Sequence, residues 1–295
     1  MRLLWAIAAL VMVACSTNRV ERGVVTTPDG ARLEYESRGE GEAIILLHGH
    51  SLDMRMWEPQ IEPFTRAGYR VIRFDFRGYG LSSEQTETEQ FTHVGDVICV
   101  MDSLGVDRAH IVGLSMGGFV GADMLGLYPE RMLSATLVSG NIRKSKGPST
   151  PMDEEESARR DREIEQLQAR GIDSYKQEWF EGLMRSGGSQ RERMREALWQ
   201  MIDEWSAWQP LHKEVRVIAG LDAWAAIQQM NPTVPTLLVE GRSEHNRFSE
   251  NPQILRHLPH GRQVVIDDCG HMLSMERPEE FNAVVLEFIG GSSRN

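Results

Sequence analysis

The sequence predicts an α/β fold in which a mostly parallel sheet is covered by helices on both faces. Short continuous apolar runs of strand length recur along the chain, and segments with helical patterns lie between them. Continuous apolar runs of this kind are typical of strands that are buried on both faces. The length of 295 residues suits one large domain or two small ones, with a sizeable core.

Composition narrows the classes of function. The chain carries 43 acidic and 32 basic residues, which gives a formal net charge of −11. A protein that binds nucleic acid without specificity would carry a basic surface, so this class is excluded. Three cysteines are too few for a disulfide scaffold, and the fold must therefore rest on packing.

Residues 1–14 are predicted to be a signal peptide. Arg2 is followed by eleven apolar residues, Leu3 to Val13, far short of the roughly 20 needed to cross a bilayer. Val13-Ala14-Cys15 resembles the lipobox of bacterial lipoproteins, in which the cysteine is lipidated and becomes the new N-terminus. The alternative is an ordinary cleaved signal with an incidental cysteine.

The lipobox resemblance implies an exported, lipid-anchored protein. Several acyl chains on Cys15 would attach the protein to a membrane, since one chain alone binds marginally, and residues 15–22 would form a tether. Ser16 after the cysteine implies, by the same resemblance, sorting to the bacterial outer membrane, facing the periplasm.

Residues 23–140 and 226–290 are predicted to form the core. Two β-rich runs, 23–27 and 31–36, flank a Pro-Asp-Gly turn, which predicts an antiparallel hairpin. The further strands are expected at 43–47, 70–75, 109–112, 135–138, 235–239 and 263–266. Helices are expected at 54–67, 91–104, 116–127 and 279–288.

Residues 141–225 interrupt the alternation and are predicted to be a helical insertion. This segment is rich in Glu, Arg, Gln and Met, and its longest strand-like run is 214–218. Tryptophans in the insertion are expected to pack it onto the sheet, with substrate contact as the alternative for one or two of them. They are Trp199, Trp205, Trp208 and Trp224.

A Gly-Leu-Ser-Met-Gly motif at 113–117 predicts a nucleophile. It follows the strand 109–112 and opens the helix 116–127, so Ser115 lies on a tight strand-to-helix turn. Such a turn strains the serine and exposes its hydroxyl, and glycine on both sides leaves room for the adjacent backbone. The alternative is a serine that only caps the helix.

A serine hydroxyl needs a base that is itself held by a third group. His271 follows the last strand and is the predicted base, while Glu244 follows the strand 235–239 and is the predicted acid. The order serine, acid, histidine along the chain fits a nucleophile on this kind of turn. Glu240 is the alternative acid, and Glu244 could instead be an ordinary surface charge.

The backbone N–H groups of His50 and Met116 are predicted to form an oxyanion hole. His50 follows His48-Gly49 at the end of the first central strand, and Met116 follows Ser115. None of the nine histidines has an HExxH or similar ligand spacing, so no metal is expected. No cofactor is expected either.

Five sequence blocks in the same order resemble the α/β-hydrolase superfamily, and most closely its small esterase, enol-lactonase and cofactor-free perhydrolase group. They are His48-Gly49 with Asp53 and Trp57, residues 75–82, residues 113–118, residues 235–244, and Gly270-His271 with residues 276–281. The resemblance covers roughly residues 23–290. It implies an eight-stranded sheet with a helical lid after the sixth strand, namely the insertion.

The resemblance also bears on the chemistry. The family's usual acid at the position of Glu244 is Asp, so this chain departs from the pattern there. Serine at 115 argues against the related epoxide hydrolases and haloalkane dehalogenases, which need a carboxylate nucleophile. The expected activity is two-step acyl transfer on a small ester or lactone. Carbon–carbon bond hydrolysis and perhydrolysis with the same triad are alternatives, and so is a membrane-tethered binding protein without the chemistry.

Overall fold

The computed structural model describes residues 20–86, 91–140, 154–212, 216–217, 223–230, 232–244, 255–258 and 260–292. Its central element is an eight-stranded sheet of order β1-β2-β4-β3-β6-β7-β9-β10. The strands are β1 (Val20–Thr26), β2 (Arg32–Arg38), β3 (Ala43–Leu47), β4 (Arg70–Phe74), β6 (Ala109–Leu114), β7 (Met132–Val138), β9 (Thr236–Gly241) and β10 (Gly261–Ile266). Only the pairs β1/β2 and β2/β4 are antiparallel, so the predicted mostly parallel sheet is confirmed.

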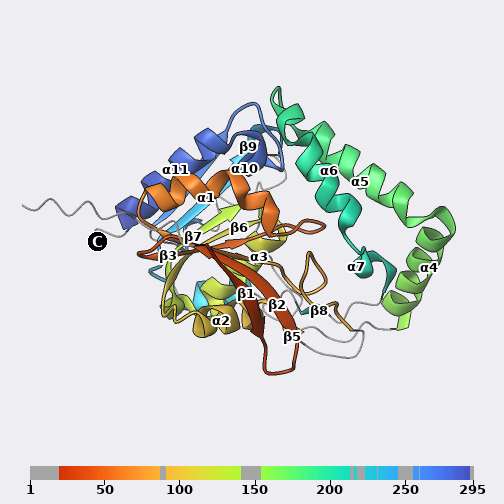
Figure 1. Cartoon of the computed structure of the whole chain (residues 1–295), viewed down its shortest axis with the longest axis horizontal. Helices are drawn as coiled ribbons and strands as arrows, with labels where there is room; N and C mark the ends of the chain where they lie inside the picture. Colours follow the sequence, from red (N-terminus) through yellow and green to blue (C-terminus); the bar gives the residue numbers. More distant parts are fainter. Residues whose placement is uncertain are drawn as a thin grey trace, which may run out of the picture.

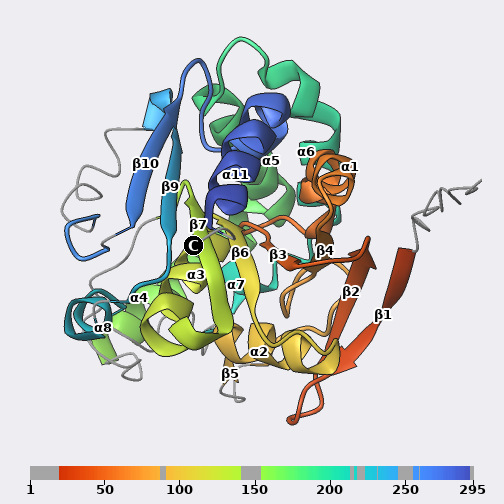
Figure 2. The same ribbon diagram turned by 90° about the vertical axis from the view of Figure 1, so that its left-hand side faces the viewer.

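Helices cover both faces of the sheet, as predicted (Figures 1 and 2). On one face lie η1 (Met54–Trp57), α1 (Glu58–Arg66), α10 (Leu273–Glu276) and α11 (Pro278–Ser292). On the other face lie α2 (His93–Ser103), α3 (Met116–Leu127) and α8 (Ala223–Met230). The short η2 (Pro129–Arg131) leads into β7.

The two faces bury separate apolar clusters. Along β3, Ile45 and Leu47 belong to the cluster under α2 and α3, whereas Ile44 and Leu46 belong to the cluster under α1 and α11. All four side chains are fully buried. Because successive side chains of a strand point to opposite faces, a strand covered on both sides must be apolar throughout.

The segment between β7, the sixth strand of this sheet, and α8 is mainly helical where it is described. It contains α4 (Glu154–Arg170), α5 (Ile172–Ser186), η3 (Arg191–Met194), α6 (Arg195–Glu204) and α7 (Trp208–Leu211). Figure 1 shows α4 to α7 to one side of the sheet, apart from α11. The run 214–218 contains the short strand β8 (Arg216–Val217), which pairs with β5 (Phe91–Thr92). This two-stranded pair was not predicted.

Three expected boundaries differ from the structure. β1 begins at Val20, inside the expected tether 15–22, because Val20 already pairs with Arg38 of β2. The expected boundary at 225/226 falls inside α8, which packs on α3 of the core. The last helix continues to Ser292. Residues 1–19, with Cys15, lie outside the described residues.

The parallel strands end at one edge of the sheet. Leu47 pairs with Gly113, Val138 pairs with Val239, and Gly241 pairs with Ile266. The segments that leave this edge are therefore neighbours. They are residues 48–51 after β3, Ser115 after β6, residues 242–244 after β9 and residues 267–271 after β10.

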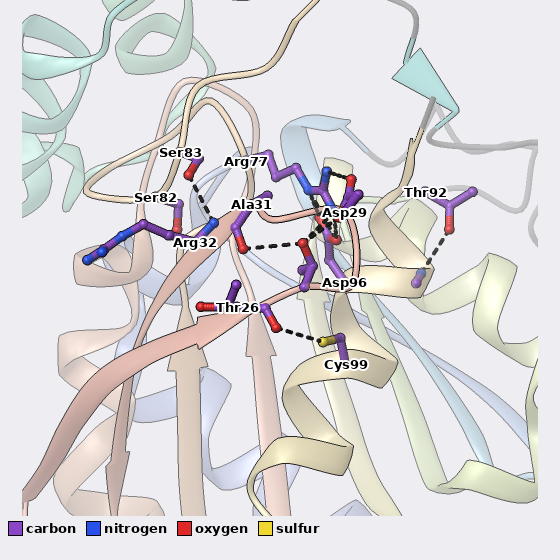
Figure 3. A network of polar contacts seen from close by, with 12 residues as sticks. Thr26, Asp29, Ala31, Arg32, Arg77, Ser82, Ser83, Thr92, Asp96 and Cys99 are labelled. Atoms are coloured by element: carbon purple, nitrogen blue, oxygen red, sulfur yellow. Dashed lines mark hydrogen bonds and ion pairs between the residues drawn. The ribbon is translucent and has the colours of Figure 1, made fainter. Parts of the chain in front are cut away.

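A buried arginine fastens the β1–β2 turn to the sheet and to α2 (Figure 3). The Arg77 guanidinium donates to Asp96 of α2 at 2.7 Å and to Asp29 of the turn at 2.5 Å, and it lies over the ring of Phe91. Arg77 lowers the pKa of Asp29 to about 2, whereas burial raises the pKa of Asp96 to about 6. These hydrogen bonds replace the hydration that the Arg77 guanidinium and the Asp96 carboxylate lose on burial.

We expect Arg77→Met to lower the free energy of unfolding by about 3–5 kcal/mol, because it leaves the Asp96 carboxylate buried without its partner. Urea unfolding at pH 8 measures the change. Arg66→Met, which removes the exposed Arg66–Glu62 pair of α1, is the control and should change stability by less than about 1 kcal/mol. Equal effects of the two substitutions would contradict this account of Arg77.

Candidate active site

Ser115 lies on the predicted tight turn between β6 and α3. Its backbone has φ 53° and ψ −109°, a conformation that residues other than glycine rarely adopt. A Cβ at Gly117 would lie 2.2 Å from the carbonyl oxygen of Leu47, and a Cβ at Gly113 would lie 2.2 Å from that of Gly117. Glycine is therefore required on both sides of the serine. The Ser115 N–H donates to Val138 O at 2.8 Å, which fixes the turn to β7.

The structure brings Glu244 and His271 together. His271 Nδ1 lies 2.7 Å from Glu244 Oε2, although the two residues are 27 positions apart in the chain. Glu244 is buried, while the side chain of His271 keeps 16% of its exposure. A carboxylate at Nδ1 holds the proton on that nitrogen and leaves Nε2 as the basic atom of the ring.

The other acidic candidates have different partners. Glu240, the alternative acid, accepts from Gln263 of β10 at 3.2 Å. Asp267 pairs with Arg242, and Asp268 accepts from the N–H of Ser189. The carboxylate in contact with the His271 imidazole is that of Glu244, despite the usual Asp at this position in the family it resembles.

His48 organises the segment that follows β3. Its Nε2 accepts from the Phe76 N–H at 2.9 Å, so the ring proton is on Nδ1, which donates to Gly49 O at 2.8 Å. Since a trans peptide points its C=O and N–H in opposite directions, this bond directs the His50 N–H away from His48. Burial lowers the pKa of His48 to about 4, so the ring is neutral at physiological pH.

The two predicted oxyanion donors lie on neighbouring segments. The Gly117 N–H donates to His48 O at 3.1 Å, which joins the first turn of α3 to the segment that carries His50. Met116 is the first residue of α3, at the positive end of the helix dipole. This arrangement suits stabilisation of a developing negative charge.

Aromatic side chains from the insertion surround His50, and the sequence did not single out all of them. The rings of Trp179 and Trp205 lie 5.8 and 4.9 Å from that of His50, and Tyr79 Oη lies 2.7 Å from His50 Nδ1. The Trp179 indole N–H also donates to Ser51 Oγ at 2.7 Å. Trp179 carried no signal in the sequence, whereas Tyr79 lies in one of the five blocks.

The other three tryptophans contact aromatic rings, and Trp199 and Trp224 also pack against the two core clusters, as predicted. Trp199 packs on Phe180, Trp208 stacks on His212, and Trp224 contacts His257. Among the described residues, no group of three His, Cys, Asp or Glu side chains is arranged to hold a metal ion. Cys99 and Cys269 are both free thiols.

Comparison with known proteins identifies the family. The model of the alpha/beta hydrolase fold family matches residues 42–278.

The chain belongs to the α/β-hydrolase fold family.

Individual α/β hydrolases are similar over most of the chain. Bifunctional epoxide hydrolase 2 of Sus scrofa is 24% identical over 97% of this chain, which spans 58% of that relative's length. A 2-hydroxy-6-oxo-6-phenylhexa-2,4-dienoate hydrolase of Comamonas testosteroni is 27% identical, with 87% of this chain and 91% of the relative covered. A thermophilic esterase structure from Thermogutta terrifontis has a TM-score of 0.70 at 26% identity, covering 92% of this chain and 99% of the esterase. The relatives are hydrolases.

The expected location of this α/β hydrolase is wrong. The relatives matched over most of the chain are named as hydrolases and an esterase, and none of the three is named as a lipoprotein, whereas the expectation rested on a few residues around Cys15. In the part of the chain that the structure describes, no helix has the length and apolar character to cross a bilayer. The names of these relatives overturn the predicted lipid anchor at Cys15 and the predicted outer-membrane, periplasm-facing location.

We expect Gly117→Ala to destabilise the α/β hydrolase by several kcal/mol, since the new methyl group would overlap the backbone of β3. Gly290→Ala on α11 is the matched control, because a Cβ there meets no atom within 4 Å. It should raise stability by about 0.5–1 kcal/mol through helix propensity. Thermal unfolding of both variants measures the difference, and an equally stable Gly117→Ala would disprove the close approach.

The buried His48 predicts an acid-sensitive fold. Its pKa of about 4 lies below the value of about 6.5 in the unfolded chain, so the unfolded state binds more protons and stability falls as pH drops below about 6.5. Between pH 7 and pH 5 the loss should be about 2 kcal/mol. His48→Asn should abolish this component in urea unfolding. The raised pKa values of Asp75 and Asp96 increase stability as the pH falls, which is opposite to the effect of His48. The difference between wild type and variant therefore isolates the contribution of His48.

Proposed function

We propose that the chain is a serine hydrolase that cleaves a carboxylic ester or lactone of a small molecule through Ser115, His271 and Glu244. The observation that carries the proposal is the 2.7 Å contact between His271 Nδ1 and Glu244 Oε2, at the sheet edge where a serine occupies the strained turn. A hydroxyl in this turn favours acyl transfer over epoxide opening, which in the family needs a carboxylate nucleophile. The proposed chemistry requires neither metal nor cofactor.

The mechanism would proceed in two steps. His271 Nε2 removes the Ser115 hydroxyl proton as Oγ attacks the carbonyl carbon, and the proton then passes to the leaving alkoxide. The N–H groups of His50 and Met116 stabilise the tetrahedral oxyanion, a contribution of about 3 kcal/mol per donor. Water, deprotonated by His271, then attacks the acyl-enzyme, and the proton returns to Ser115 Oγ as the acyl–Oγ bond breaks and the acid is released. Glu244 orients the imidazole and stabilises its cation.

The segment around α4 to α7, residues 141–225 in the predicted division, serves in this proposal as a lid over the carboxyl edge of the sheet. Support comes from Trp179 and Trp205, which place lid side chains against His50. The lid would shape the acyl or alcohol pocket.

A second candidate is hydrolysis of a carbon–carbon bond. The Comamonas testosteroni relative, whose name describes a dienoate hydrolase, covers most of both chains at 27% identity. The same serine, histidine and oxyanion donors would act on a vinylogous diketone. Product analysis on such a substrate separates this candidate from an esterase, and peroxide-dependent halide oxidation would reveal a perhydrolase.

Ser115→Ala tests the proposal. We expect it to lower kcat/KM for p-nitrophenyl esters by at least about 10³-fold and to abolish labelling by a fluorophosphonate. Ser103→Ala, an exposed serine at the end of α2, is the control and should react normally. A wild-type chain that forms no adduct at Ser115 would favour the binding protein without chemistry.

A further inference from the structure

A tight polar contact between the proposed lid and the core lies at the turn between α5 and η3. We call this contact the lid anchor: residues 186–189 of the lid against Ser243, residues 268–270 and Glu276 of the core. The Gly188 N–H donates to Glu276 Oε1 at 2.6 Å, and the Ser189 N–H donates to Asp268 Oδ1 at 2.9 Å. Ser243 Oγ lies 2.5 Å from Ser186 O.

The lid anchor is a contact between backbones. A Cβ at Gly270 would lie 2.0 Å from Ser186 O, and a Cβ at Gly188 would lie 2.0 Å from Asp268 O. Neither residue has the positive φ that would explain glycine by its conformation. Close approach of the two chains is therefore the reason for glycine at both positions.

The core side of the anchor consists of the segments that carry the acid and the base. Ser243 precedes Glu244, and Gly270 precedes His271. The Ser243 N–H donates to Cys269 O at 3.3 Å, so the two segments are also joined to each other. Glu276 completes the link, because its Oε2 accepts from the Gly270 N–H at 3.2 Å while its Oε1 accepts from the lid.

We propose that Glu276 is a positioning residue whose carboxylate couples the seating of the lid to the orientation of His271, through Gly188 on one side and Gly270 on the other. The inference rests on the proposed function, since it assigns a role relative to the base. It adds a residue outside the triad and the oxyanion hole, together with a reason why the lid must be seated for His271 to face Glu244.

The electrostatics of Glu276 fit a role other than stability. Its side chain is fully buried at the last residue of α10, with Arg277 and Asp268 as the charged neighbours. Burial raises its pKa, so the ionised form is less stable in the folded protein than in water. A neutral side chain would lose less solvation free energy on burial than a carboxylate. A carboxylate, however, can accept from two separate N–H groups at once, one on each oxygen.

Glu276→Gln is the decisive variant, because glutamine keeps the shape but offers only one acceptor oxygen. We expect kcat for a p-nitrophenyl ester to fall about 10- to 100-fold with KM changed less than about threefold, as for a misplaced catalytic group. The melting temperature should fall by a few degrees at most, since one N–H of the anchor loses its acceptor. Glu287→Gln, the same change on the exposed side of α11, should leave both kcat and melting temperature unchanged.

Gly188→Ala tests the coupling from the lid side without altering Glu276 or His271. Its methyl group would open the anchor, so the same loss of kcat is expected, and this variant also decides the matter should Glu276→Gln fail to fold. Unchanged kcat in Gly188→Ala, or a lower melting temperature with unchanged kcat in Glu276→Gln, would overturn the inference.

Fluorophosphonate labelling separates the two proposals. Labelling of wild type at Ser115 with slower labelling of both variants supports the coupling. If wild type and both variants are labelled at equal rates, the positioning role of Glu276 is overturned and the proposed function stands. Absence of any adduct in wild type overturns the proposed function and the inference with it.

Discussion

The site depends on one steric constraint, the close approach of β3, β6 and α3 around Ser115. No Cβ fits at Gly113 or Gly117, so the helix begins almost in contact with the end of β3. Two backbone bonds, from Ser115 N–H to Val138 O and from Gly117 N–H to His48 O, then tie the turn to the neighbouring strands. The strained serine conformation persists because the surrounding backbone leaves it no alternative. The positions of His50 and Met116 relative to each other follow from the same contacts.

Sequence patterns sufficed wherever a strand or its end determined the structure. The apolar run at 43–47 is a strand because both faces are buried. Ser115, Glu244 and His271 each follow a parallel strand of the same sheet, so topology alone brings them to one edge. Among the contacts of the proposed lid, that of Trp179 had no comparable signal. Trp179 reaches Ser51 across 128 residues, from a helix whose position depends on tertiary packing. The two-residue strands β5 and β8 are too short for any periodicity to show.

Two histidines with similar local sequences differ because of their partners. His48 and His271 both follow a strand and lie beside a glycine, yet His48 is fully buried between a backbone donor and a backbone acceptor. That environment removes its basicity. His271 instead faces a carboxylate and keeps partial exposure. In the sequence, His271 was predicted as the base because it comes after the serine and the acid in the chain. The physical difference between the two histidines lies in tertiary contacts that no local motif encodes.

The segment that we propose as a lid touches both halves of the proposed machinery, and the two contacts differ in kind. At the acid–base side the contact is made by glycines, backbone groups and the carboxylates of Glu276 and Asp268, which tolerate little change in geometry. At the oxyanion side it is made by aromatic side chains, with Trp179 on Ser51 and Trp205 stacked against Tyr79. Side chains can be exchanged without moving the backbone, whereas a backbone contact fixes the position of a whole element. In the proposed lid, the side chains near His50 can therefore be exchanged while the backbone contact beside His271 and Glu244 stays the same.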